Sequence, residues 1–520
     1  MANREELAII RGARAGLAES QLALGRLYLF GSTGLPKSLQ TALHWLDRAA
    51  RQGSAEAWQL IGNHIPLELA QQSAHPVTGW YEKAYDGGLV RAGLVYAQLV
   101  LGNGAPHPTG AQRAKALRAL EEAGRAGFAE AQWLLAREHG LPAQGRAGAE
   151  VQGAASEGPA AHRWLRRAAD NGVAQAQFAL LEQAWDAQDW PAYLSRALPL
   201  ARALADAAVS QNRTCARLAP DEVTLLSRCA RLVEAGSVPH DVGAQELHTF
   251  WELAAAEQDR HAQLALGLWC ARMRVDGKRM PGNAGAANFK KAVRWLSLAG
   301  EQGLAEAWYA LSRIYIKPEF SQRNVLEAQK YLERAAEMGY RDAQFECGNA
   351  AWRARRENEN NDVRAVFWLQ KAAAQDCPKA AVALRKIAPR NPEAWKGLAS
   401  LLAGRELSNH PLLAARLELA LAFGLSRAET LLLDIKNADR GHCLVIDIRA
   451  SYGRSRRRLV LVETAQERQL LDRVAAVFEH VDCGPGGPEG NYRQRLYRLR
   501  TLFPEADAAT GPDLDYGLAA

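Results

Sequence analysis

The sequence predicts an all-α fold: a solenoid of about ten tandem helix pairs that ends in a small C-terminal α+β segment. Three observations predict it. The chain has 520 residues, too many for one compact core, whereas a repeat array escapes that limit because each repeat packs only against its neighbours. Alanine is frequent and β-branched residues are sparse, which favours helix. A residue pattern also recurs every 35 to 45 residues.

The first half of each repeat predicts a helix, called helix A. A glycine or aspartate opens the repeat, a small residue follows four positions later, and an apolar residue follows after four more. These spacings place the small and apolar residues on one helical face. We expect each opening glycine to end the preceding helix in the left-handed conformation. The opening residues are Gly16, Gly53, Gly88, Gly127, Gly172, Gly303, Gly339 and Asp376, and the small residues are Ser20, Ala57, Ala92, Ala131, Ala176, Ala307, Ala343 and Ala380.

The second half predicts helix B, with the pattern Ala-x-x-Trp-x-x-x-Ala-Ala. The pattern appears at residues 42–50, 161–169 and 365–373, and Tyr331 takes the tryptophan position in another copy. Small residues let two helices approach closely, and the ring fills the gap between consecutive pairs. In the middle of the chain the pattern weakens but helical periodicity continues. There we expect helices near 173–185, 189–208, 220–235 and 243–257.

This pattern resembles the Sel-one-like repeat family, a branch of the tetratricopeptide superfamily. The resemblance is strongest at residues 16–53, 127–172 and 303–376. It implies a right-handed superhelical scaffold for protein complexes, commonly bacterial, without catalytic activity of its own. The glycine-rich loop that the family carries between helices A and B is kept only in fragments such as YLFGSTGLPKS.

We expect four segments along the chain. Regular repeats occupy residues 1–172 and 259–432, degenerate helical repeats occupy 173–258, and a separate arginine-rich segment occupies 433–520.

The last segment predicts a β-hairpin followed by two helices. Residues 441–449 and 457–463 are rich in β-branched residues and flank a turn-like stretch. Thr464 and Glu467 form a capping box that opens a helix to about residue 480. A glycine- and proline-rich stretch then precedes a basic helix that begins near Asn491.

Four tryptophans are candidate contacts for a protein partner: Trp58, Trp133, Trp308 and Trp352. They lie on helix A at positions where the periodicity does not require an apolar residue, and an exposed tryptophan can anchor a peptide. The alternative is that they belong to the core between repeats. The A-to-B loops also carry insertions at 140–160, 277–290 and 353–363, which either mark a binding edge or reflect the tolerance of exposed loops.

Two arginine clusters are candidate anion-binding sites. Arginine interleaved with tyrosine binds phosphate groups and stacks on bases, although a charged edge strand and a solvated helix face would carry the same residues. The clusters are Arg454, Arg456, Arg457 and Arg458 at the hairpin, and Arg493, Arg495, Arg498 and Arg500 in the last helix.

The sequence carries no motif for a cofactor, a metal or catalysis. The twelve histidines and seven cysteines have no metal-binding spacing, and neither a phosphate loop nor a G-x-S-x-G elbow occurs. We therefore expect a protein that is not an enzyme. The scattered cysteines, and the lack of a signal peptide or a long apolar run, predict a cytoplasmic location.

Three functional hypotheses follow. The first is a protein-protein interaction scaffold or adaptor that binds a protein or peptide on its superhelical surface. The second is a nucleic-acid-associated regulator that uses the C-terminal arginines, although a net charge of +7 is too diffuse to indicate nucleic acid by itself. The third is an envelope or exopolysaccharide assembly scaffold. The oligomeric state cannot be read from the sequence.

Overall fold

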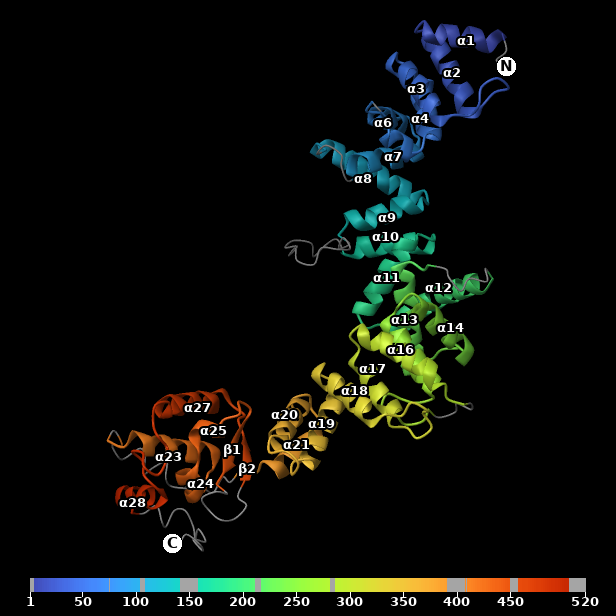
Figure 1. The fold of residues 1–520 in the computed structure, drawn as a ribbon. Helices are drawn as coiled ribbons and strands as arrows, with labels where there is room; N and C mark the ends of the chain where they lie inside the picture. The colour runs from blue at the N-terminus through green and yellow to red at the C-terminus, as the bar shows by residue number, and fades with distance from the viewer. Residues whose placement is uncertain are drawn as a thin grey trace. The chain divides into compact units, whose positions relative to one another are not determined.

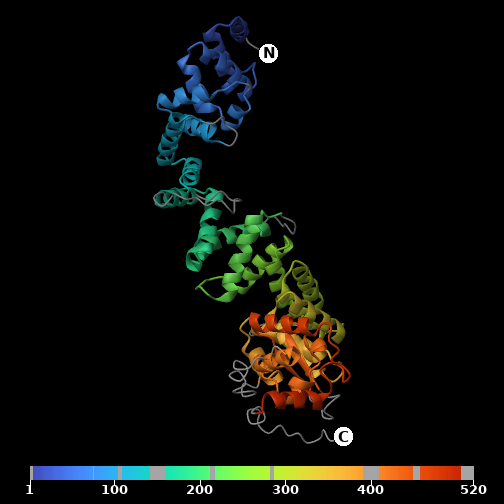
Figure 2. The ribbon, with the colours of Figure 1, turned by 90° about the vertical axis from the view of Figure 1, so that its left-hand side faces the viewer.

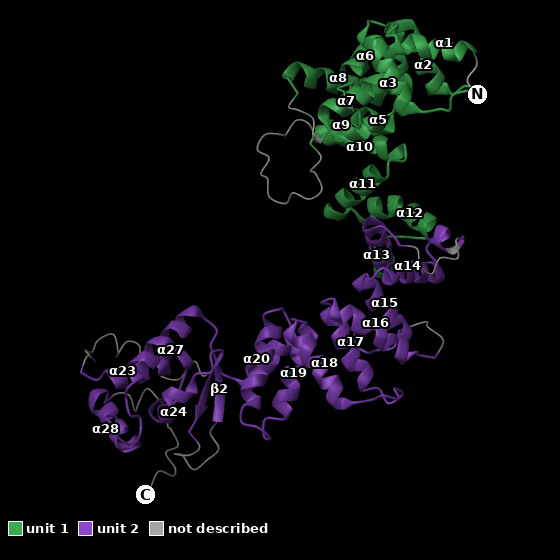
Figure 3. Ribbon diagram, turned by 45° about the horizontal axis from the view of Figure 1, so that its top comes forward, with its two compact units in different colours: residues 1–204, 232–240 green, residues 205–231, 241–520 purple. Residues whose placement is uncertain are grey.

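The computed structural model describes residues 4–73, 75–102, 108–140, 158–210, 217–280, 286–390, 407, 409–448 and 457–504. The chain forms two compact units (Figure 3). Unit 1 comprises Met1–Leu204 and Leu232–His240, and unit 2 comprises Ala205–Arg231 and Asp241–Ala520.

Unit 1 is built from helices that follow one another in chain order (Figures 1 and 2). The A and B helices of a repeat pack on each other, as α2 does on α3, α7 on α8 and α9 on α10. The helices are α1 Arg4–Arg14, α2 Ala18–Phe30, α3 Leu39–Arg51, α4 Ala55–His64, α5 Leu67–Gln71, α6 Thr78–Asp86, α7 Val90–Leu101, α8 Gly110–Arg125, α9 Ala129–Glu138, α10 Gly158–Asp170, α11 Ala174–Asp186 and α12 Trp190–Ser210, the last of which continues past the unit boundary.

Unit 2 continues the helix pairs and then changes character. Its elements are α13 Pro220–Ala235, which also spans the boundary, α14 Ala244–Ala256, α15 Arg260–Ala271, α16 Phe289–Glu301, α17 Ala305–Tyr315, α18 Val325–Glu337, α19 Arg341–Arg353, α20 Asn361–Ala373, α21 Pro378–Ile387, α23 Pro411–Phe423, α24 Arg427–Leu432, α25 Ile435–Ala438, β1 Cys443–Asp447, β2 Arg457–Leu461, α27 Ala465–Phe478 and α28 Tyr492–Leu502.

The helical-repeat prediction is confirmed, and the repeat positions behave as their chemistry requires. The opening glycines have φ between 83° and 94°, the left-handed region that favours glycine. At Gly303, for example, the N–H of Leu304 donates to the carbonyl of Ala299 at 3.2 Å, which closes a Schellman cap between α16 and α17. The small residues Ala57, Ala307 and Ala343 are each fully buried, so helix A meets its neighbours there at close range. The four helices expected in the middle of the chain correspond to α11 to α14.

A glutamine that the sequence pattern did not identify joins successive repeats. It follows the small residue of helix A directly, as Gln344 follows Ala343. The Nε2 of Gln344 donates to the carbonyl of Ala336 in the preceding helix B, and its Oε1 accepts from Gln375 in the next turn at 2.9 Å. Such a side chain satisfies backbone and side-chain groups of both adjoining turns. The equivalent residues are Gln21, Gln132 and Gln263, which accept from Gln52, Asn171 and Gln302.

The predicted β-hairpin is present, and its two faces lie in different cores. β1 pairs antiparallel with β2, and Val445 lies opposite Leu459. On one face Val445 and Leu459 pack with Leu369 and other residues of α20 and α21. On the other face Leu444 and Val460 belong to the core of the C-terminal helices. The hairpin therefore covers the last repeats, as Figures 1 and 3 show, because each of its faces is apolar.

The last helices and the hairpin share one core, the C-terminal core, which includes helices on both sides of residue 433. It consists of the packed residues of α23, α24, α25, β1, β2, α27 and α28, from Leu413 to Phe503. Capping boxes open α27 at Thr464 and α28 at Asn491, as predicted for the first of these helices. The four-segment division of the chain stays a prediction, but α23 and α24 share this core with the hairpin.

Candidate partner-binding surfaces

Trp58 lies on α4 as part of a small aromatic cluster in unit 1. Its half-buried ring stacks on Trp80 of α6, with centroids 6.4 Å apart and an interplanar angle of 7°. The ammonium group of Lys83 lies 5.0 Å from each ring centroid. Trp80 donates from Nε1 to Asp47 at 2.9 Å. Trp58 is therefore part of a stacked pair with a positive charge near both rings rather than an isolated ring.

Trp133 lies on α9 of unit 1, directly before a residue that lines a groove, although Trp133 itself does not line it. Its ring is half-buried against the core, and the next residue, Leu134, lines the groove. The groove has a volume of about 220 Å³ and lies between α5, α7, α8 and α9. Half-buried Leu67 and Leu101 supply further apolar wall, and exposed Arg137 lies at its margin. This arrangement suits an apolar side chain flanked by polar groups.

Trp308 fills the core of unit 2. It is 3% exposed, its ring stacks on Tyr331 with centroids 5.5 Å apart, and the guanidinium of Arg334 lies 3.9 Å from its centroid. A ring enclosed in this way offers no surface to a partner.

Trp352, at the end of α19, is half-buried, and the guanidinium carbon of Arg355 lies 4.5 Å from its ring centroid.

Trp269 was not among the candidate tryptophans, although it is 37% exposed. Its ring centroid lies 4.1 Å from that of the His248 imidazole and 4.0 Å from the guanidinium carbon of Arg272. The sequence did contain a signal for this environment, since a basic residue three positions after a tryptophan can reach the ring. The same spacing covers Trp164 with Arg167 and Trp352 with Arg355.

The hairpin arginines that the structure describes are bound within unit 2. Arg457 donates from Nε to Asp362 of α20 at 2.8 Å and also pairs with Asp447 at 3.2 Å. Arg458, on the opposite face, donates to both carboxylate oxygens of Glu429 at 2.6 and 2.8 Å. These bidentate pairs hold the hairpin to α20 and α24. Arg454 and Arg456 lie outside the described residues.

The arginines of α28 divide by burial. Arg495 is 9% exposed and donates to the backbone carbonyls of Leu431 and Cys483. Half-buried Arg498 donates to the carbonyl of Glu489 at 2.6 Å. Arg493 and Arg500 lie on the exposed side of the helix. The four arginines therefore do not form one continuous surface.

The predicted loop edge is described only in part. The insertion at 353–363 is anchored by two hydrogen bonds, from Asn361 to the carbonyl of Ala354 and from Arg457 to that of Glu359, while residues 356–360 are exposed. The insertions at 140–160 and 277–290 include residues 141–157 and 281–285, which lie outside the described residues.

Within the described ranges, no group of three or more His, Cys, Asp or Glu side chains is placed to hold a metal ion. No helix in the part of the chain that the structure describes has the length and apolar character that crossing a bilayer demands.

Comparison with known proteins identifies the repeat. The Sel1 repeat model matches residues 18–54, 156–173, 261–304, 305–340 and 355–377. A solved protective antigen of uropathogenic Escherichia coli, described as having an SLR fold, is 19% identical, with 98% of this chain and 94% of that chain covered and a TM-score of 0.43. A Sel1 repeat protein from Oxalobacter formigenes is also 19% identical, with 74% and 90% covered and a TM-score of 0.24. No curated protein matches the chain.

Proposed function

We propose that this chain, a Sel1-repeat protein, is a non-catalytic scaffold that binds a protein or peptide partner on the helix-A surface of unit 1. The groove between α5, α7, α8 and α9, which Leu134 lines, is the observation that carries the proposal. Its apolar wall is formed by half-buried leucines of successive helices, and repeat arrays bind partners along such surfaces. An apolar side chain of the partner would displace water from Leu101 and Leu134 while Gln98 offers hydrogen bonds to its backbone.

The test is affinity capture from native cells with three full-length variants. Leu134→Arg places a charge in the groove, and exposed Arg137→Glu reverses a charge at its margin without touching the core. Leu326→Arg makes the same chemical change at a 75% exposed leucine of α18 and serves as the matched control. Mass spectrometry should find proteins captured by the wild type and by Leu326→Arg that both groove variants fail to retain.

Two outcomes would refute the proposal. Capture of no specific protein by the wild type would remove the scaffold function. An unchanged set of captured proteins with Leu134→Arg and Arg137→Glu would remove the groove as the binding surface. Thermal unfolding of each variant distinguishes lost binding from a lost fold.

A nucleic-acid function receives less support from the arginines. Arg457 and Arg458 donate hydrogen bonds to carboxylates of the chain itself, and Arg495 is buried. The envelope-scaffold alternative has no specific observation in its favour. We also propose a cytoplasmic location, supported by six free cysteines among the described residues, of which Cys229, Cys347, Cys377 and Cys443 are buried. Fractionation of cells that express the native chain tests this location.

A further inference from the structure

A pocket of about 280 Å³ lies in the C-terminal core, where the N-terminal end of α23 meets α28. Leu412 and Leu413 line it from the first turn of α23, and Arg416 lines it from the next turn. Arg495 and Arg498 line it from α28. The pocket is separate from the unit 1 groove and from the proposed scaffold function.

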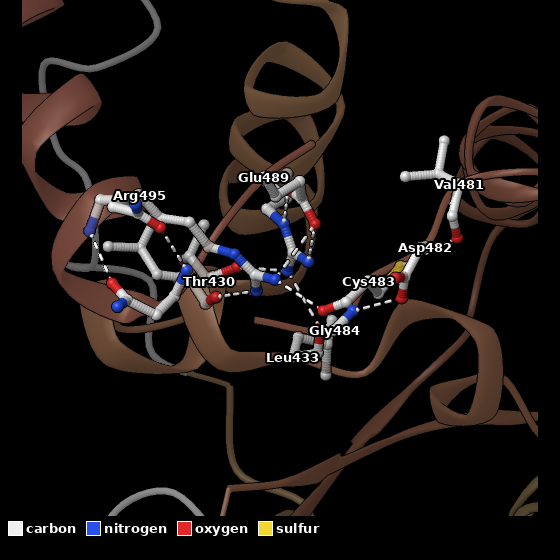
Figure 4. Close-up of polar contacts among 12 residues, drawn as sticks. Thr430, Leu433, Val481, Asp482, Cys483, Gly484, Glu489 and Arg495 are labelled. Atoms are coloured by element: carbon white, nitrogen blue, oxygen red, sulfur yellow. Dashed lines mark hydrogen bonds and ion pairs between the residues drawn. The ribbon is translucent and has the colours of Figure 1, made fainter. Parts of the chain in front are cut away.

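Positive charge exceeds negative charge in the wall of this pocket, because three arginines face one glutamate. Arg416 is 2% exposed and pairs with Glu489 through Nε at 2.6 Å and Nη2 at 2.7 Å. Its Nη1 donates to the carbonyls of Thr430 and Leu433, both at 3.0 Å (Figure 4). Glu489 thus neutralises one guanidinium, and the charges of Arg495 and Arg498 remain in excess.

Burial lowers the pKa of Arg495, and the neighbouring charge of Arg416 lowers it further. This direction is the response of a guanidinium that has too little negative charge around it. Glu489 is the carboxylate nearest to it, with an Arg495 Nη2 to Glu489 Oε2 distance of 3.5 Å.

Several hydrogen-bond donors at the pocket have no acceptor. The Nη1 and Nη2 of Arg495 reach backbone carbonyls at 2.7 and 2.8 Å, but its buried Nε has no hydrogen-bond partner in the part of the chain that is described. The helix bonds of α23 begin with Ala414 donating to His410, and no side chain caps this helix. The N–H groups of Leu412 and Leu413 therefore lack acceptors among the described residues.

We propose that this pocket binds the carboxylate group of a small organic acid. A carboxylate accepts from the α23 N–H groups and the Arg498 guanidinium, and it supplies the negative charge that the wall around Arg495 lacks. The side chains of Leu412, Leu413 and Leu431 form apolar walls that suit a short hydrocarbon body. These walls favour an organic carboxylate over free phosphate, because the polar oxygens of phosphate would lie against apolar leucine side chains.

Ligand-observed NMR and thermal unfolding of the full chain test the proposal, with hexanoate as the probe. Hexanamide has the same body without the charge, and inorganic phosphate has charge without the body. Hexanoate should bind and raise the melting temperature, as a ligand of the folded state does. Hexanamide should not bind, and phosphate should bind more weakly than hexanoate.

Arg498→Gln should weaken hexanoate binding by about tenfold or more, because it removes a charge-assisted hydrogen bond. Arg498→Lys keeps the charge and should restore part of the affinity. Arg500→Gln removes an exposed arginine of the same helix that does not line the pocket, and it should bind as the wild type does. Since Arg498 is half-buried, melting temperatures without ligand show whether each variant is folded.

Three results would overturn the proposal. The first is no hexanoate binding at concentrations up to about 10 mM. The second is equal affinity of folded Arg498→Gln and Arg500→Gln. The third is phosphate binding tighter than hexanoate, which would assign the pocket to a phosphate group instead.

Discussion

Gln344 shows how one side chain can connect two turns of a repeat array. It is 3% exposed, donates to the carbonyl of Ala336 at 3.1 Å and accepts from Gln375. Gln344→Leu keeps the apolar stem but removes both of these hydrogen bonds, while the Ala336 carbonyl still accepts from the Gly339 N–H and the Gln375 amide still donates to the Gly339 carbonyl. We expect a loss of about 1–3 kcal/mol in unfolding free energy, the net contribution of two intramolecular hydrogen bonds.

Denaturant unfolding followed by circular dichroism measures this loss. The control is Gln322→Leu, at an exposed glutamine of the loop before α18, where little change is expected. Equal stability of Gln344→Leu and the wild type would mean that the glutamine contacts contribute nothing to the array.

Single residues also mark the limit of inference from sequence. The repeat pattern correctly placed the small residues and the left-handed glycines because their partners lie within one repeat. The arginine clusters could not be interpreted in the same way, because their partners are distant. Arg457 pairs with Asp362, 95 positions earlier, and Arg416 pairs with Glu489, 73 positions later. A charge cluster in the sequence does not reveal which carboxylates fold against it.

Helix pairs depend on close approach at particular glycines. A Cβ added to Gly348 of α19 would lie 2.7 Å from Cγ of Leu369 in α20 and 3.2 Å from the carbonyl oxygen of Ala365. Gly348→Ala should therefore separate the two helices and destabilise the protein by about 1–3 kcal/mol, although alanine favours the helix by about 1 kcal/mol.

Thermal unfolding should report this change against a matched control. A Cβ added to Gly79 of helix α6 would meet no atom within 4 Å, so Gly79→Ala should leave stability unchanged or raise it. A stabilised Gly348→Ala would contradict the close-approach argument.

The C-terminal core should lose stability in acid, because ion pairs hold its carboxylates ionised. Burial raises the pKa of Glu429, but hydrogen bonds from Arg458 and Ser426, together with the charge of Arg458, bring it below its usual value. A hydrogen bond from Arg468 lowers the pKa of Asp439. A folded-state pKa below the unfolded one gives stability that is complete above the unfolded pKa and is lost as the pH falls through the folded pKa. The unfolding free energy of the C-terminal core should therefore decrease as the pH falls below about 4.5.

Peptide-resolved hydrogen exchange between about pH 6 and pH 3, corrected with an unfolded reference, measures this loss. Arg458→Met should destabilise the core at neutral pH by about 3–5 kcal/mol, since it leaves Glu429 buried without its partner, and it should reduce the acid dependence. If protection in β2 and α24 stays constant down to pH 3, the ion pairs do not control stability.

The hairpin illustrates what an element's sequence reveals and what it hides. Its β-branched residues predicted two paired strands, and β1 and β2 pair in register. The sequence could not reveal that both faces are buried, since that depends on α20 and α23, which are distant along the chain. For the same reason the sharing of one core by α23 and the hairpin was not predicted.

At the scale of the whole molecule, a destabilising substitution in one repeat should lower the stability of that repeat and its neighbours only. Each helix pair contacts its neighbours in the sequence, so the free energy of the array is approximately a sum of repeat and interface contributions. This local encoding is also why the helical repeats could be predicted from the sequence, whereas the groove and the pocket could not. They require side chains from several helices at fixed distances.

Leu311→Ala tests this property. Leu311 is fully buried in the core around α17, so the change should remove about 2–5 kcal/mol. Hydrogen exchange should increase in α15 to α19, while protection of α2 and α3 in unit 1 should stay as in the wild type, because nearest-neighbour coupling fades with each repeat. Leu326→Ala, at an exposed leucine of the adjacent α18, should change neither region. An equal loss of protection in both units would show that the chain unfolds as one cooperative body, and the additive description of the array would then be wrong.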